Sequence, residues 1–286
     1  MASTEAPEVL RYAAFTGDPA GGNPAGVVLD ATGLDASRML ALAAEVGYSE
    51  TAFITGRDEA RRRFSVRYFS PLAEVAFCGH ATLATSVALA ERIGTGALLF
   101  DTPAGEIGVD TVTGPDGKVR ATLTSVPTRS RPAEAIEVDA TLAALRWAAA
   151  DLDPDLPPHV SFAGNDHLVL AAASRARLAD LAYDFDALTA VMRTHGWTTV
   201  HLVWRESEGS YHARDPFPVG GVVEDPATGA AAAAFGGYLR TLGLVTAPRT
   251  VAVRQGEDMG RPSDLTVEVD PYETRVRVTG QAVPIP

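Results

Sequence analysis

Short runs of apolar residues, alternating with polar ones and separated by Gly- and Pro-rich turns, fill most of the chain and predict more strands than helices. Helical spacing of apolar residues is found at Ala36–Val46, which Asp35 caps, and in an Ala-rich stretch that opens at Ala81 and ends near Gly94. The strands predicted around these helices are Leu10–Phe15, Gly26–Leu29, Thr51–Thr55, Phe64–Phe69, Ala97–Asp101, Glu106–Val112 and Val119–Thr124.

The same order of elements returns after a polar segment bracketed by Pro127 and Pro132, which is predicted to link two domains. The matching segments are Asn23–Leu29 with Asn165–Leu170, Tyr48–Ile54 with Trp197–Val203, and the Ala-rich helices that follow Gly79 and Asp225. Chance likeness of two Ala-rich helices is the alternative, and the shared order of four elements favours a repeat. We therefore predict an α+β fold of two pseudo-symmetric domains, residues 1–126 and 127–286, each a mixed β-sheet or barrel wrapped around a central helix. The last strand, Thr274–Thr279, is a candidate to return to the first domain.

The charge balance excludes several classes of partner. Lys and Arg number 24 against 36 Asp and Glu, a net charge of −12, which argues against nucleic acid or an anionic membrane surface. The longest uncharged stretch, Val75–Ala90, is shorter than the roughly 20 apolar residues that span a membrane. The start has no basic segment followed by an apolar run, so we expect no signal peptide and a soluble, cytoplasmic protein.

Cysteine and lysine each occur only once, which excludes several kinds of structural site and catalytic mechanism. Cys78 is the single cysteine, which excludes a disulfide framework, a Cys-based structural zinc site and an iron–sulfur cluster. Lys118, the one lysine, lies in a predicted hairpin turn, where it cannot be desolvated as a Schiff-base lysine must be. The six histidines show no i, i+4 pair of the kind that binds zinc on a helix. We expect no metal and no organic cofactor.

The two Ala-rich helices begin with sharp polar sequences, one at Cys78-Gly79-His80 and one at Asp225 to Ala230. A helix N-terminus offers unpaired N–H groups and a partial positive charge to an anion. If the two domains face each other, both helix starts point into one cleft that would bind a small carboxylate. The candidate substrate-binding positions are Gly79, Gly229 and Ala230. The alternative is that Thr82, Asp225 and Thr228 only cap their helices.

Glu50 is the candidate proton carrier. It begins an otherwise apolar strand, and its counterpart in the second copy is Thr199, so only one half carries this carboxylate. Moving a proton between carbons needs a group that both takes and returns it near neutral pH, and burial brings glutamic acids toward that range. A strand glutamate paired with an arginine is the alternative.

Several segments together resemble the phenazine-biosynthesis PhzF-like family. They occur in order between residues 15 and 263, nearly the whole chain. The segments are Gly22–Gly26, Ser49–Phe53, Phe69–Pro71 with Glu74 and Val75, Cys78–Ala84, Glu224–Gly229, Gln255–Gly256 and Met259–Ser263.

The resemblance implies a diaminopimelate-epimerase-like fold, assembled as a homodimer. It also implies a cofactor-free isomerase, in secondary metabolism, that moves a proton within a small unsaturated carboxylic or amino acid. The family's acid/base group falls on Glu50, and the groups that hydrogen-bond or protonate the substrate fall on His80 and Asp225. Ala230 stands where the family often has serine, so one hydroxyl contact is lost while the backbone N–H remains.

Two alternatives stay open. A non-catalytic protein of the same fold would bind a small carboxylate or act as a scaffold. An epimerase or racemase would need non-thiol bases, because Cys78 has no second cysteine to act from the opposite side. We expect Cys78 to be a small buried residue whose side chain points away from the site.

Overall fold

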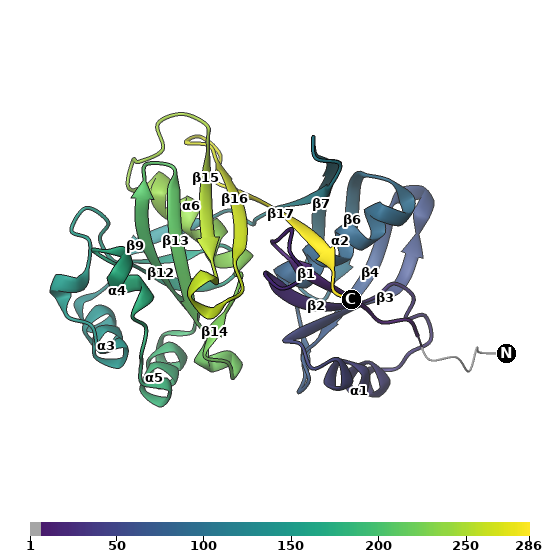
Figure 1. Cartoon of the computed structure of the whole chain (residues 1–286), viewed down its shortest axis with the longest axis horizontal. Coiled ribbons are helices and arrows are strands. Elements are labelled where there is room, and N and C mark those ends of the chain that lie inside the picture. The colour runs from purple at the N-terminus through teal and green to yellow at the C-terminus, as the bar shows by residue number, and fades with distance from the viewer. Residues whose placement is uncertain (1–6) are drawn as a thin grey trace. The chain divides into compact units, whose positions relative to one another are not determined.

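The computed structural model describes residues 7–286. Packing divides them into two units: the described residues up to Thr124 join Thr279–Pro286 in the first unit, and Ser125–Val278 form the second. Figure 1 shows the helices and strands of both units.

The first unit is a barrel of strands wrapped around one helix. Following the pairings from β1 through β2, β3, β4, β6, β7, β8 and β17 leads back to β1, so the sheet closes on itself. The strands are β1 (Leu10–Ala14), β2 (Asn23–Val28), β3 (Glu50–Asp58), β4 (Arg63–Phe69), β5 (Glu74–Val75), β6 (Gly96–Thr102), β7 (Gly105–Thr113), β8 (Val119–Thr124) and β17 (Arg277–Pro284). The central helix is α2 (Gly79–Ile93), and every residue from His80 to Ala90 is buried. Mostly small side chains let the strands surround this helix, and the buried hydroxyls of Thr82, Thr85 and Ser86 each donate to a backbone carbonyl four residues back.

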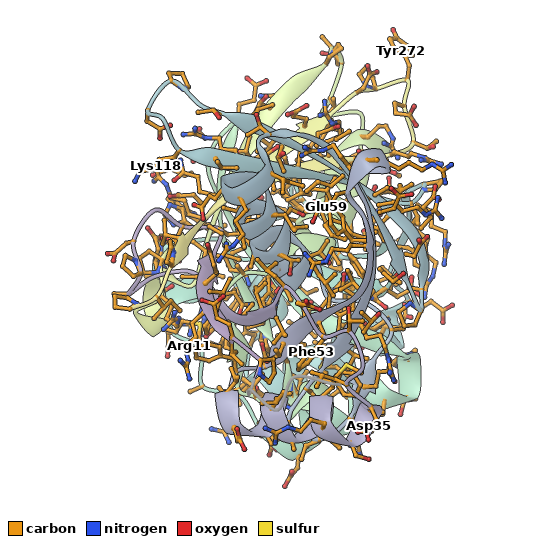
Figure 2. The ribbon with its side chains drawn as sticks, turned by 90° about the vertical axis from the view of Figure 1, so that its right-hand side faces the viewer. Arg11, Asp35, Phe53, Glu59, Lys118 and Tyr272 are labelled. Atoms are coloured by element: carbon orange, nitrogen blue, oxygen red, sulfur yellow. The ribbon has the colours of Figure 1, made fainter. Side chains whose placement is uncertain are left out.

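A second helix of this unit, α1 (Ala36–Val46), packs outside the barrel. Asp35, labelled in Figure 2, caps it as predicted. The Asp35 side chain accepts a hydrogen bond of 2.8 Å from the N–H of Arg38. Its buried face, which includes Met39, packs with Phe53 and Phe69 of the barrel. Fully burying one such side chain contributes about 1.5–3 kcal/mol.

The second unit repeats the same strand order. From β10 to β16 the pairings alternate antiparallel, parallel, antiparallel, parallel and antiparallel, as they do from β1 to β7. Its strands are β9 (Arg129–Pro132), β10 (His159–Phe162), β11 (Asp166–Ala171), β12 (Trp197–Ser207), β13 (Ser210–Pro216), β14 (Glu224–Asp225), β15 (Arg249–Gln255) and β16 (Ser263–Val269). The register matches too: Glu50 on β3 lies opposite Ala25, and Thr199 on β12 lies opposite His167. The predicted α+β fold of two similar units is confirmed.

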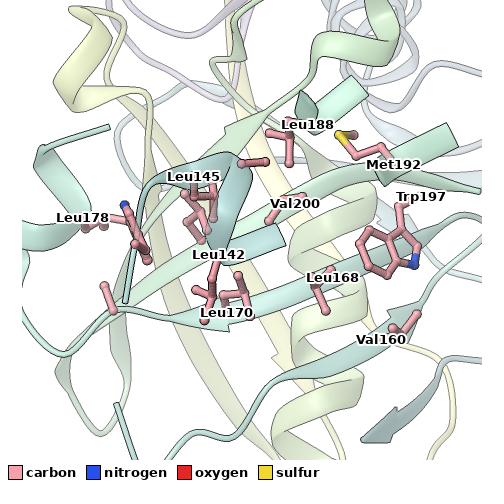
Figure 3. Packing of buried hydrophobic residues seen from close by; sticks show 14 residues of the cluster. Leu142, Leu145, Val160, Leu168, Leu170, Leu178, Leu188, Met192, Trp197 and Val200 are labelled. Carbon is pink, nitrogen blue, oxygen red and sulfur yellow. The ribbon is translucent and has the colours of Figure 1, made fainter. Parts of the chain in front are cut away.

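The helix corresponding to α2 is α6 (Gly229–Thr241), which is buried from Ala231 to Leu239. Three further helices belong to this unit: α3 (Ala135–Leu145), α4 (Arg175–Ala179) and α5 (Phe185–His195). Leucines of these helices form one apolar cluster with strand residues such as Leu168 and Trp197 (Figure 3). Short 3₁₀ turns complete the chain at Glu59–Arg61, Ala149–Asp151, Pro218–Gly220 and Glu257–Met259.

Three predicted segments differ from the structure. The expected linker Pro127–Pro132 contains strand β9, which pairs with β10 at Arg131↔Val160. The last strand is Arg277–Pro284 instead of Thr274–Thr279, and it runs through Gly280, where a Cβ would clash with the Phe15 ring. Gly280 looks like the end of a strand in the sequence, but it lies inside β17, where the backbone passes close to Phe15. Helix α2 begins at Gly79, two residues before the predicted Ala81.

The hairpin predicted around Lys118 is confirmed. Gly117 has φ 74° there, and Lys118 is exposed at the tip between β7 and β8 (Figure 2). In the described part of the chain, no helix is both long and apolar enough to cross a membrane.

Candidate active site

Glu50 and His80 meet at the end of the first barrel where β3 and α2 begin. Glu50 is the first residue of β3, and His80 is the second residue of α2. Their side chains approach to 3.5 Å between Glu50 Oε2 and His80 Nε2. The His80 side chain is 7% exposed and that of Glu50 is 18% exposed, so the carboxylate remains reachable from solvent.

Cys78 belongs to the same cluster. The expectation that it is buried is confirmed, and the expectation that its side chain points away is wrong. Its thiol donates to Glu50 Oε2 over 3.6 Å, and Sγ lies 3.4 Å from His80 Nδ1. Cys78 is the N-cap residue of α2, yet its side chain makes no capping hydrogen bond. The short turn Cys78-Gly79-His80 therefore places the thiol and the imidazole side by side at the start of the helix.

Two residues at strand starts complete the surroundings of His80. Asn23, the first residue of β2, has Nδ2 3.2 Å from His80 Nδ1. The hydroxyl of Ser49, just before β3, lies 3.4 Å from His80 Nε2. Both residues stand in segments that carry the family resemblance, but neither was predicted as a site residue. Their position where β2 and β3 begin is the signal that could have identified them.

The imidazole of His80 is held in its neutral form. Burial lowers the pKa of His80, and the negative charge of Glu50 and a hydrogen bond to the backbone of Pro24 oppose that effect only in part. Because proline has no N–H, this bond runs from a ring N–H of His80 to the Pro24 carbonyl. The other ring nitrogen therefore keeps a lone pair.

Thr82 stabilises the first turn of α2, but it does not cap the helix. Its hydroxyl donates to the carbonyl of Cys78 over 2.7 Å and so accepts from the Tyr68 hydroxyl, also 2.7 Å away. The capping role considered for Thr82 is wrong, because its oxygen bonds backward to a carbonyl instead of accepting from an N–H of the first turn.

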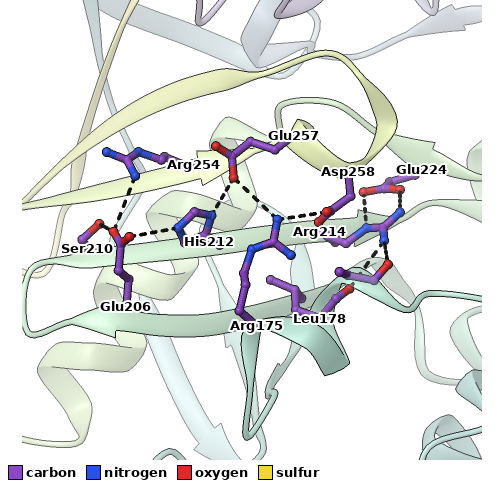
Figure 4. A network of polar contacts seen from close by, with 11 residues as sticks. Arg175, Leu178, Glu206, Ser210, His212, Arg214, Glu224, Arg254, Glu257 and Asp258 are labelled. Atoms are coloured by element: carbon purple, nitrogen blue, oxygen red, sulfur yellow. Dashed lines mark hydrogen bonds and ion pairs between the residues drawn. The ribbon is translucent and has the colours of Figure 1, made fainter.

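An arginine–glutamate pair braces the segment before each central helix. In the first unit Arg67 on β4 donates twice to Glu74 on β5, with both distances 2.7 Å. In the second unit Arg214 on β13 donates twice to Glu224 on β14, over 2.9 and 2.6 Å (Figure 4). The pairs occupy equivalent places, since each joins the long strand to the two-residue strand that precedes the helix.

Asp225, the third predicted catalytic residue, lies in the second unit. Its Oδ2 accepts a bond of 2.6 Å from the hydroxyl of Thr228. Gln255 accepts from the N–H of Thr228 over 3.0 Å and donates to the carbonyl of Asp225 over 2.7 Å. The N-cap residue of α6 is Thr228 and not Asp225, and the Thr228 side chain makes no capping bond, so the capping role considered for Thr228 is wrong.

The predicted binding positions lie at helix starts. Gly79 is the first residue of α2, and Gly229 and Ala230 are the first two residues of α6. All three are partly exposed, as an N–H group that meets a ligand must be. The first unit therefore brings Glu50, His80 and Gly79 to one end of its barrel, while the second unit carries the other predicted residues.

A buried polar network in the second unit was missed by the sequence analysis. Thr199 donates to Asp215 Oδ1 over 2.8 Å and accepts from His167 Nδ1 over 2.8 Å, and His201 Nδ1 lies 2.9 Å from Asp215 Oδ2. Burial lowers the pKa of His167 to about 4. The alternation of Thr199 and His201 along one strand was the available signal, because both face the same side.

Comparisons with known proteins agree with this architecture. Residues 12–286 match the family model described as phenazine biosynthesis-like protein. The chain is 32% identical to the uncharacterized isomerase YddE of Escherichia coli K12, over 97% of this chain and 96% of that protein. It is 30% identical to trans-2,3-dihydro-3-hydroxyanthranilate isomerase of Pseudomonas chlororaphis, over 94% of each. A crystal structure of a PhzF-family phenazine biosynthesis protein from Bacillus anthracis superposes with a TM-score of 0.86 at 27% identity, covering 97% of this chain and 96% of that one.

Proposed function

The chain is an isomerase of the phenazine biosynthesis-like family, and from this premise we propose that Glu50 moves a proton within a small unsaturated carboxylic or amino acid. The observation that carries the proposal is the partly exposed Glu50 carboxylate, 3.5 Å from a buried neutral histidine at the start of α2. The relative named for a dihydrohydroxyanthranilate supports a small carboxylate as the substrate class.

In this mechanism Glu50 takes a proton from one carbon and returns it to another. Negative charge that develops on the substrate is stabilised by the N–H groups at the start of α2, including that of Gly79. His80 holds a polar group of the substrate or relays a proton. Its neutral imidazole suits either task, since it offers one N–H and one lone pair.

Asp225 is proposed to hold a second polar group of the substrate. Its carboxylate is fixed by Thr228 and indirectly by Gln255, which supports a positioning role because a fixed acceptor loses little entropy on binding. Gly229 and Ala230 would offer N–H groups at the start of α6, without the hydroxyl that a serine would add at position 230.

The remaining parts of the proposal concern cofactors and assembly. We propose that the reaction needs neither metal nor organic cofactor, since a carboxylate and a helix start can supply the acid/base and electrostatic terms. Lys118, exposed at a hairpin tip, is unsuited to Schiff-base chemistry. A cytoplasmic homodimer acting in secondary metabolism is proposed from the family resemblance.

The test is the Glu50→Gln variant, assayed for isomerisation of small unsaturated carboxylic acids. Removing a general acid/base typically lowers the rate about 10²–10⁴-fold, so turnover should fall by that factor while substrate binding persists. Glu45→Gln, which changes an exposed carboxylate on α1 outside the barrel, is the matched control. Asp225→Asn and His80→Ala should weaken both binding and rate. In deuterated water the wild-type product should carry partial label. Full activity of Glu50→Gln would refute the assignment.

A further inference from the structure

Glu50, Cys78 and His80 form a group whose ligand atoms are close enough to share one metal ion, the one such group found among residues 7–286. The three sides of the triangle are 3.6 Å from Cys78 Sγ to Glu50 Oε2, 3.5 Å from Glu50 Oε2 to His80 Nε2, and 3.8 Å from His80 Nε2 to Cys78 Sγ.

These lengths fit one face of a tetrahedral zinc site. With Zn–S about 2.3 Å and Zn–N and Zn–O about 2.0–2.2 Å, tetrahedral angles give donor–donor edges of roughly 3.3–3.6 Å. Each edge of the triangle has to contract by only a few tenths of an ångström. Sγ lies nearer to His80 Nδ1, at 3.4 Å, than to Nε2, so the ring or the thiol also has to turn until the Nε2 lone pair and Sγ face one ion. By contrast, 3.5 Å between His80 and Glu50 is too long for a good direct hydrogen bond, which spans about 2.7–3.2 Å.

The chemistry of the donors also suits zinc. Thiolate, imidazole and carboxylate are all common zinc ligands, and three protein ligands leave a fourth position for water. The carbonyl of Pro24 accepts a ring N–H of His80, which is the outer contact that metal-bound histidines usually have. The positive end of α2 weakly opposes a cation. A thiolate and a carboxylate together balance the charge of the ion.

We propose that Glu50, Cys78 and His80 bind one zinc ion and that the bound ion inhibits the enzyme. On binding, the Cys78 thiol loses its proton to solvent and a Zn–S bond forms, with no change of oxidation state. Zinc occupies the carboxylate oxygen that would accept the substrate's proton, so catalysis stops while zinc is bound. This inhibitory effect rests on the function proposed above, whereas the binding does not.

The test begins with metal-free full-length protein, titrated with Zn²⁺ by calorimetry and with Co²⁺ by absorption spectroscopy. Wild type should bind one equivalent of zinc, and its cobalt form should show a thiolate charge-transfer band, which only Cys78 can supply. Cys78→Ser should lose the band and bind zinc at least about tenfold more weakly. Ser86→Ala, which removes a side-chain donor from the same helix, should bind zinc as wild type does.

The outcomes separate this inference from the proposed function. Zinc binding with a thiolate band in a protein that isomerises nothing would retain the metal site and refute the function. Isomerisation without zinc binding, or zinc binding of equal strength in Cys78→Ser, would overturn the metal site. Activity that persists at full zinc occupancy would overturn the inhibition. The cobalt spectrum of wild type decides the site even if Cys78→Ser does not fold.

Discussion

The two arginine–glutamate pairs allow a comparison of the same contact at two depths. Replacing Glu224 by Gln leaves Arg214 with a neutral partner, and replacing Glu74 by Gln does the same to Arg67. The geometry is alike, since each pair has two short hydrogen bonds. The surroundings differ: the side chains of Arg214 and Glu224 are 9% and 4% exposed, and those of Arg67 and Glu74 are 32% and 35% exposed.

The burial of each pair sets how much its Glu→Gln variant should lower the free energy of unfolding. Breaking a buried pair leaves an uncompensated charge and typically costs about 3–5 kcal/mol. The amide of Gln still accepts one bond, so we expect Glu224→Gln to lower the free energy of unfolding by about 3 kcal/mol, the lower end of that range. At the more exposed pair, solvent screens the charge, and Glu74→Gln should cost less than about 1 kcal/mol.

The assay can observe the second unit separately. The three tryptophans, Trp147, Trp197 and Trp204, all lie in it, so their fluorescence during urea unfolding follows that unit. Glu74→Gln is followed by far-UV circular dichroism and by hydrogen exchange of α2. Replacing Arg214 and Glu224 together by Met should recover part of the loss, because no buried charge remains. Equal effects of Glu224→Gln and Glu74→Gln would refute the reasoning.

Two further predictions concern the second unit. The pKa of His167 is about 4 in the folded protein and about 6.5 in the unfolded chain, so the unfolded chain binds the proton first as the pH falls. The free energy of unfolding should therefore decrease by up to about 3 kcal/mol as the pH drops from about 6.5 to 4. Tryptophan-monitored unfolding at several pH values measures this decrease, and the same pH dependence in His167→Gln would contradict the assignment. A Cβ on Gly256, at φ 77°, would clash with the carbonyl oxygen of Arg261, whereas Gly260, at φ 75°, has open space. Gly256→Ala should therefore lose about 1–3 kcal/mol more in urea unfolding than Gly260→Ala, and equal losses would show that the contact is relieved.

The repeat was accessible to sequence analysis. The ungapped alignment of Glu50 with Thr199 agrees with the structure, where the two residues hold equivalent positions: Glu50 lies opposite Ala25 and Thr199 opposite His167. The sequence did not predict these partners. The strand β9 was missed because its pairing partner, β10, lies on the far side of helix α3 in the chain, and the local sequence between two prolines is typical of a loop.

The sequence predicted residues of the site better than it predicted the contacts between their side chains. Glu50 and His80 were found from motifs, yet the direction of the Cys78 side chain depends on how α2 enters the barrel, which no local pattern encodes. No local pattern predicts the burial of Arg214 and Glu224 either, because it depends on how α4 and β14 pack around β13. Tertiary surroundings, not residue type, separate this buried pair from its exposed counterpart.

The strand β17 has a consequence for the order of events during synthesis. It pairs with β1 to close the first barrel, although the whole second unit lies between them in the chain. Residues 125–278 are contiguous and can fold as soon as they leave the ribosome. The barrel that holds Glu50 and His80 has to wait for β17. The half of the molecule made first is therefore completed last, and until then α2 is surrounded by an unclosed sheet with two free edges.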